Sequence, residues 1–223
     1  MGDAIGQMLA SAVGIAISPL PLIAVVLMLA TPHGRTNGIA FAAGWTASIA
    51  LLTALIVAFG GGTRTSGQPA SWTLWLKLAL GALFLVLAWK QWQGRPREGH
   101  GARPPAWMRA VDKFTPGKSA GLAGALALAN PKNLVLTVGG ALSIASSGAD
   151  GTGKTVAAIL MVLIASACAT VPLAVYLFGG ARAERVLAGW KTWMADHNAA
   201  IMIVVLTVLG AKYIGDALSG LTA

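Results

Sequence analysis

Two polar interruptions inside apolar segments hold the residues with the most evident capacity for chemistry. Asn130-Pro131-Lys132-Asn133 lies in the middle of one apolar run, and Ser18-Pro19-Leu20-Pro21 lies inside another. Proline lacks an N–H and clashes with the preceding helical turn, so each motif should break a helix and free backbone carbonyls. Lysine adds a cation, while serine and asparagine add hydrogen-bonding groups. Together the two motifs predict a polar site that suits an anionic ligand.

The composition indicates what positions these residues. Of the 223 residues, 56% are hydrophobic and 10% are charged, and the mean hydropathy is +0.72. A soluble domain of this size could not cover so much apolar surface. Runs of about 20 apolar residues are long enough to span a bilayer as helices. We therefore expect an all-α, polytopic membrane protein with six transmembrane helices, near 4–30, 37–60, 72–92, 118–147, 154–179 and 198–220.

The six expected spans divide into two halves. Residues 1–92 would form the first three-helix repeat, 93–117 a basic cytoplasmic loop, and 118–223 a second three-helix repeat of opposite orientation. The two interruptions fall in the first and fourth spans, the first span of each half. Interrupted helices at matching places in inverted repeats are typical of transporter binding sites. Two unrelated proline kinks are the alternative.

Lys132 lies about 14 residues into the fourth span, roughly 20 Å along a helix, which is too deep for easy snorkelling to either surface. A cation at that depth costs at least about 3 kcal/mol, so it should face the bundle interior. No Asp or Glu occurs in the central part of any expected span. The alternative is a kink whose lysine is neutral or satisfied by water. The candidate substrate-binding residues are Ser18, Pro19, Pro21, Asn130, Pro131, Lys132 and Asn133.

The positive charges are distributed unequally between the connections. Those after spans one, three and five hold Arg35; Arg95, Arg97, Arg103, Arg109, Lys113 and Lys118; and Arg182, Arg185 and Lys191. Those after spans two and four hold only Arg64 and Lys154. This asymmetry predicts a multi-pass protein of the inner (plasma) membrane with both termini outside the cytoplasm. Topology then accounts for most of the net charge of +9, and no nucleic-acid partner is expected.

A possible outer gate lies near the end of the chain. Lys212 and Asp216 are four residues apart and can pair on one face of a helix. Lys77 enters the third span from the same side. A gate could use Asp216 to take up a proton. Ordinary snorkelling anchors at the membrane surface are the alternative.

Gly148-Ala-Asp-Gly-Thr-Gly-Lys154-Thr155 matches the phosphate-binding loop of nucleotide hydrolases. That mechanism requires a buried strand before the loop, a helix after it and a separate Asp for magnesium, and this segment has none of that context. A glycine-rich turn is the better interpretation. His33, His100, His197 and the single Cys168 show no ligand-like spacing, so we expect no metal, no cofactor, no disulfide and no catalytic activity.

Small residues recur at four-residue spacing in three places. The stripes are Ala10, Gly14 and Ser18; Ala40, Gly44 and Ser48; and Gly117, Gly121, Ala125 and Ala129. Such stripes let helix backbones approach closely. We expect them to pack the bundle, although the same faces could support a homodimer.

Several phrases resemble one family. They are Ile17-Ser-Pro-Leu-Pro21, Thr31-Pro-His-Gly-Arg-Thr-Asn-Gly38, Gly44-Trp45, Trp107-Met-Arg-Ala-Val-Asp-Lys-Phe-Thr-Pro-Gly117, Asn130-Pro-Lys-Asn133, Asn198-Ala-Ala-Ile-Met202 and Gly210-Ala-Lys-Tyr-Ile-Gly-Asp216. The chain resembles the actinobacterial Gap-like family, the peptidoglycolipid-addressing and sulfolipid-addressing proteins, within the lysine exporter superfamily. This resemblance implies six helices and a role in moving cell-envelope glycolipids towards the surface.

These observations favour a transporter that moves an anionic or polar-headed glycolipid across the inner membrane. Its partners would be membrane lipids, the glycolipid substrate and a partner efflux pump or lipid synthase. One alternative is an exporter of a small water-soluble solute such as an amino acid. The other is a non-transporting accessory scaffold for a lipid export complex.

Overall fold

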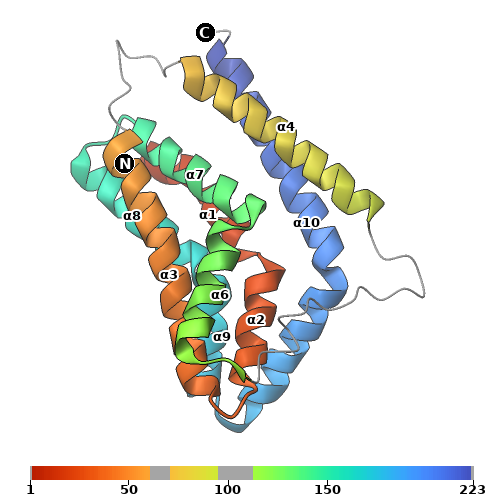
Figure 1. Cartoon of the computed structure of the whole chain (residues 1–223). Coiled ribbons are helices and arrows are strands. Elements are labelled where there is room, and N and C mark those ends of the chain that lie inside the picture. Colours follow the sequence, from red (N-terminus) through yellow and green to blue (C-terminus); the bar gives the residue numbers. More distant parts are fainter. Residues whose placement is uncertain (1, 61–70, 95–112, 222–223) are drawn as a thin grey trace.

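The structure, a computed structural model, describes residues 2–60, 71–94 and 113–221 (Figure 1). Within these ranges every regular element is a helix, which confirms the all-α expectation there. The elements are α1 (Gly2–Ala16), α2 (Pro19–Leu29), α3 (Gly34–Phe59), α4 (Ser71–Gln93), α6 (Pro116–Leu128), α7 (Pro131–Ser146), α8 (Gly151–Ala165), α9 (Ala167–Phe178), the 3-10 turn η3 (Gly180–Arg182) and α10 (Ala183–Leu221). Residues 95–112 of the expected basic loop lie outside the described residues.

Both predicted helix breaks are present, and their backbones match closely. Ser18 separates α1 from α2 with φ −81° and ψ 115°, and Asn130 separates α6 from α7 with φ −78° and ψ 114°. A residue before proline is pushed into the extended region by the proline ring, which explains the similarity. The sequence therefore located these breaks correctly. The inverted relationship between the halves stays a prediction.

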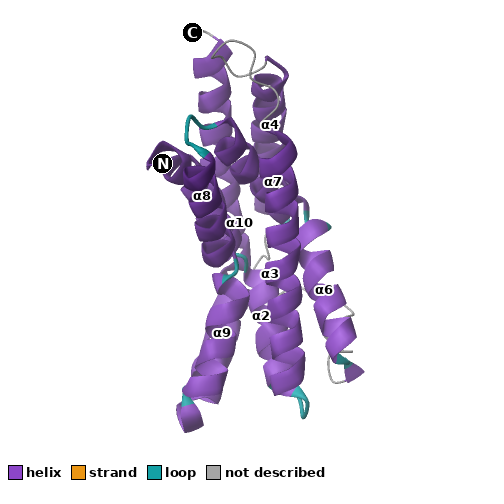
Figure 2. Ribbon diagram, turned by 90° about the vertical axis from the view of Figure 1, so that its left-hand side faces the viewer, coloured by secondary structure: helices purple, strands orange, loops and turns teal. Residues whose placement is uncertain are grey.

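A third break, between α8 and α9, was not predicted. The two helices bend by 59° at Ser166. Here the N–H of Ala169 bonds the carbonyl of Ser166, and the carbonyl of Ala165 accepts a 3.2 Å hydrogen bond from Trp45 Nε1 of α3. A buried indole N–H needs such a partner. Figure 2 shows this break halfway along the bundle.

The six-span expectation is not confirmed. Among the described residues, α3, α4 and the segment Gly180–Leu221 are each long and apolar enough to cross a membrane. Two bent pairs, α1 with α2 and α8 with α9, raise the number to five if each pair is one span. The α6–α7 pair is not among these candidates. The helices are compatible with a multi-pass membrane protein.

The last helix differs from its expected limits. A connection was expected before a span starting near residue 198, but α10 is one continuous helix of 39 residues from Ala183. Ala183 and Leu187 are buried on one side of its first turns, whereas Glu184 and Arg185 are exposed. This amphipathic pattern lets the helix continue through residues that charge counting assigns to a loop.

Close helix contacts depend on small residues. A Cβ built on Gly44 of α3 would lie 2.8 Å from the backbone of Ala120 in α6, and Gly124 faces Ser48 in the same contact. The predicted stripe containing Gly44 therefore packs as expected. The stripe containing Gly121 was wrong, since a Cβ there meets nothing within 4 Å and α6 uses its neighbouring face. The rotation of α6 about its own axis decides which of its faces packs against α3.

Tyr213 of α10 contacts three other helices at a second close contact. Its hydroxyl lies 3.1 Å from Ser11 Oγ in α1, and its ring packs beside Phe84 of α4. A Cβ built on Gly139 of α7 would collide with the Tyr213 hydroxyl. A residue larger than glycine therefore does not fit at position 139, because Tyr213 of α10 occupies the space that its side chain would need.

Replacing Gly139 by alanine should lower the free energy of unfolding by about 1–3 kcal/mol, because the added methyl group overpacks a rigid contact. Thermal unfolding of the purified protein in detergent measures the change. The matched control is Gly121→Ala, whose methyl group enters open space and should leave the melting temperature unchanged or raise it slightly. Equal destabilisation by the two substitutions would contradict the Gly139–Tyr213 contact.

Candidate functional site

The first and fourth predicted spans meet where each is broken. Lys132, in the first turn of α7, is 3% exposed, and its Nζ donates a 2.9 Å hydrogen bond to Ser18 Oγ at the start of α2. Ser18 Oγ donates in turn to Asn133 Oδ1 at 2.9 Å. The three side chains form one buried chain of hydrogen bonds, although Ser18 lies 114 positions before Lys132 and 115 before Asn133 in the sequence. We call this set the Lys132 site.

The charge environment of the Lys132 site is unusual. Within the described residues, Ser18 Oγ is the one hydrogen-bond acceptor of Lys132 Nζ, and the one ion pair is Lys212–Asp216 elsewhere. An ammonium group carries three N–H donors, so two have no protein partner in the described part of the chain. A buried cation without a carboxylate partner is costly. The site is therefore suited to an anionic ligand.

The two asparagines stabilise the broken backbone. Asn130 Oδ1 accepts from the N–H of Lys132 at 3.1 Å and caps α7, while Asn133 Nδ2 donates to the carbonyl of Leu126 at 3.0 Å near the end of α6. Both amide atoms of Asn133 thus have protein partners. These contacts hold Lys132 in place, so Asn130 and Asn133 act chiefly in positioning.

The remaining predicted site residues are divided by burial. Pro19 and Pro21 are buried in α2, whereas Pro131 is exposed although it follows the α6–α7 break. Sequence reasoning did not include Cys168, which lies in the first turn of α9 close to Lys132. The third break therefore also lies near the Lys132 site. The residue in the sequence that best indicates this third break is Pro172, inside α9.

The proposed gate residues do not join the Lys132 site. Lys212 Nζ and Asp216 Oδ2 are 2.6 Å apart, and their side chains are 33% and 40% exposed. They lie towards the C-terminal end of α10, and no described hydrogen bond or ion pair links them to the Lys132 site. Lys77 is partly buried in α4, the helix that packs along this part of α10. The pair forms at the predicted spacing, and its role as a gate stays a prediction.

The phosphate-loop match is part of a helix start. Asp150 caps α8 by accepting from the N–H of Gly153 at 2.9 Å. Lys154 Nζ donates to the carbonyl of Ala145 at 2.7 Å, close to the end of α7. The preceding element is a helix, so the segment lacks the strand that the phosphate-binding loop requires. The glycine-rich turn is confirmed only for residues 148–150, because Gly151 to Thr155 already belong to α8, a following helix that was not expected to begin here.

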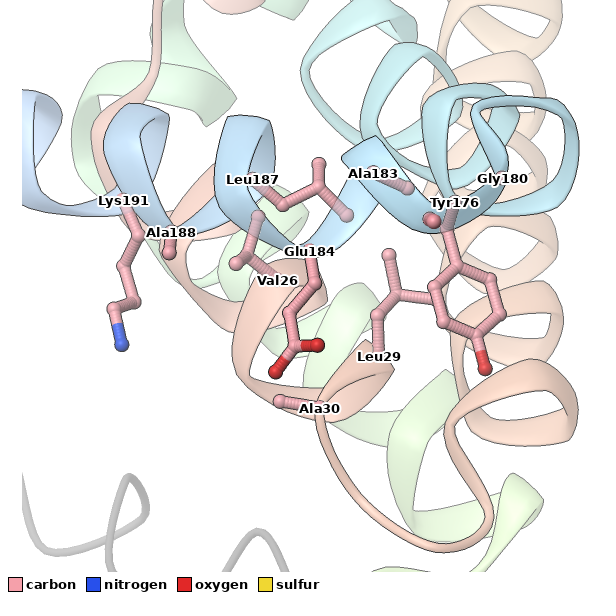
Figure 3. A pocket seen from close by; sticks show the side chains of 11 residues that line it. Val26, Leu29, Ala30, Tyr176, Gly180, Ala183, Glu184, Leu187, Ala188 and Lys191 are labelled. Atoms are coloured by element: carbon pink, nitrogen blue, oxygen red, sulfur yellow. The ribbon is translucent and has the colours of Figure 1, made fainter.

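A hollow of about 490 Å³ lies at the other end of α2, between α2, α9 and the start of α10 (Figure 3). We call it the α2–α10 pocket. Figure 3 shows Tyr176, Glu184 and Lys191 extending towards one side of it. The described residues include no ion pair between Glu184 and Lys191. Its other lining residues are Val26, Leu29, Ala30, Gly180, Ala181, Ala183, Leu187 and Ala188.

Comparison with known proteins supports a lipid-related assignment. Residues 8–219 match the model of the family described as SfLAP: Sap, sulfolipid-1-addressing protein. No curated protein and no solved structure matches. The resemblance to sulfolipid-addressing proteins is confirmed, and the wider lysine exporter superfamily stays a prediction. The match spans nearly the whole chain, so the protein belongs to the sulfolipid-1-addressing protein family.

Proposed function

We propose that this protein transports a lipid with an anionic or polar head across the inner membrane towards the cell surface. The observation that carries the proposal is the Lys132 ammonium group, which is buried where two broken helices meet and has a neutral hydroxyl as its hydrogen-bond partner. An anionic head would provide the missing counter-charge. The family match supports a lipid over other anions.

The broken helices provide a way to expose the Lys132 site alternately. The chain changes direction at Ser18 and Asn130, so the segments on either side of each break can tilt separately. Tilting would open a path to one membrane surface and close the other. The protein would use no catalytic chemistry, and its driving force would come from a gradient or from a partner pump or lipid synthase.

The surface hollows favour a lipid substrate. Besides the α2–α10 pocket, one groove lies between α3 and α8 and another between α4 and α10, and both are lined mainly by apolar side chains. In a membrane such grooves can accept acyl chains, so only the head of the lipid needs a polar path. The α2–α10 pocket would load the head from the cytoplasmic side, with both chain termini on the outer side.

Two alternatives differ in what they require. An exporter of a small water-soluble solute would move that solute without any lipid, and a non-transporting scaffold would move nothing when purified alone. Proteoliposomes that contain only this protein distinguish all three, because they report transport of a labelled lipid and of labelled amino acids separately. A homodimer is compatible with each function.

Replacing Lys132 by glutamine should reduce translocation of a fluorescent lipid sulfate in proteoliposomes about tenfold or more, because the head loses its charged partner. Translocation of a neutral-headed analogue should change much less. Lys118→Gln makes the same chemical change at an exposed position and should have no effect. Unchanged flux of the lipid sulfate in the Lys132 variant would remove Lys132 from the mechanism.

Replacing Ala188 by tryptophan should raise the KM for the lipid sulfate several-fold and leave kcat nearly unchanged, because the indole fills the α2–α10 pocket without touching the Lys132 site. The control is Val186→Trp, on the same helix at an exposed position outside the pocket lining. Steady-state transport in proteoliposomes measures both constants. Identical kinetics for the two variants would exclude the pocket as the loading site.

A further inference from the structure

Ser166, at the unpredicted third break, has an unusual side chain. It is 2% exposed, and its hydroxyl is one of three buried side-chain atoms in the described residues that have no hydrogen-bond partner. Serines elsewhere in the bundle, such as Ser48 and Ser143, donate to a carbonyl four residues earlier in their own helix. The Ser166 hydroxyl makes no such bond, although the backbone N–H of Ser166 bonds the carbonyl of Val162, four residues earlier. A buried hydroxyl without a partner is costly and needs an explanation.

The position of Ser166 relates it to the Lys132 site. It is the N-cap of α9, yet its side chain makes no capping hydrogen bond. Cys168, two residues later, lies close to Lys132. Helix α9 also contacts both α1 and α2, the helices on either side of Ser18. The start of α9 therefore lies beside the same buried cation as the starts of α2 and α7.

The starts of α2, α7 and α9 then lie near one site. The N-terminus of a helix carries a partial positive charge from its aligned peptide dipoles, which favours a nearby anion. Lys132 adds a full charge with two donors that no described residue accepts, and Ser166 adds a hydroxyl donor. A planar carboxylate has two oxygens, whereas a sulfate or phosphate ester presents three terminal oxygens to donors from three directions.

We propose that Ser166 and the N-terminus of α9 complete the Lys132 site as its third wall, and that the site binds a sulfate or phosphate monoester. This inference rests on the proposed function, because it assumes that the Lys132 site receives an anionic head. Ser166 donates to one terminal oxygen and Lys132 to the others. Trp45 is a positioning residue, since its hydrogen bond to the Ala165 carbonyl stabilises the bend that presents Ser166.

Ligand binding to the full chain in phosphatidylcholine nanodiscs tests this assignment. The melting temperature is measured against increasing octyl sulfate, octyl phosphate, inorganic sulfate and inorganic phosphate, since a ligand stabilises the state that it binds. Ser166→Ala should raise the Kd for the octyl esters about tenfold, the effect of one lost hydrogen bond to a charged group. Ser166→Thr keeps the hydroxyl and should recover most of the affinity.

Matched variants separate this inference from the proposed function. Ser143→Ala removes a buried hydroxyl that bonds its own helix, so it should leave the Kd unchanged. If Lys132→Gln abolishes binding and Ser166→Ala binds normally, the third wall is wrong and the proposed function survives. If neither variant changes the Kd, or if no ester binds the wild-type protein, both proposals fail. Binding of the octyl esters but not of inorganic ions identifies a lipid head as the source of the oxyanion.

Discussion

The hydrogen bond from Lys132 to Ser18 is the interaction on which the rest of the site depends. It places a cation in the interior of an apolar bundle, where a charge is stable only if polar atoms surround it. The helix break at Ser18 supplies the one acceptor of Lys132 Nζ among the described residues, and Asn133 connects that hydroxyl to the end of α6. That acceptor is a side-chain hydroxyl and not one of the backbone carbonyls that the breaks were expected to free.

Close packing around the site depends on residues without side chains. Membrane helices gain little from the hydrophobic effect against one another, so dispersion contacts between closely placed backbones become important. Gly44 allows α3 to approach α6, and Gly81 and Gly210 face each other between α4 and α10. The second contact joins two unbroken helices, and the first attaches unbroken α3 to α6, which precedes the break at Asn130.

The third break changes the view of the molecule as two equivalent halves. Among the described residues, the predicted first half (1–92) has one break within a span, at Ser18, whereas the predicted second half (118–223) has breaks at both Asn130 and Ser166. Helix α3 is one continuous helix, whereas α8 and α9 bend by 59°. The added bend brings α9 towards Lys132 and is held by Trp45. An anion at the Lys132 site would therefore contact the second half more than the first.

The sequence by itself determined the membrane character, the helical class and the breaks at Ser18 and Asn130, because hydropathy and the steric effect of proline act over a few neighbouring residues. It also indicated that Lys132 would need an interior partner. Only the tertiary structure decided that this partner is Ser18, that Trp45 bonds Ala165, and that α6 packs through Gly124 instead of Gly121. Those contacts depend on how each helix is rotated about its axis and crosses its neighbours. Uniformly apolar helices do not specify that rotation locally, since all their faces suit lipid and protein almost equally.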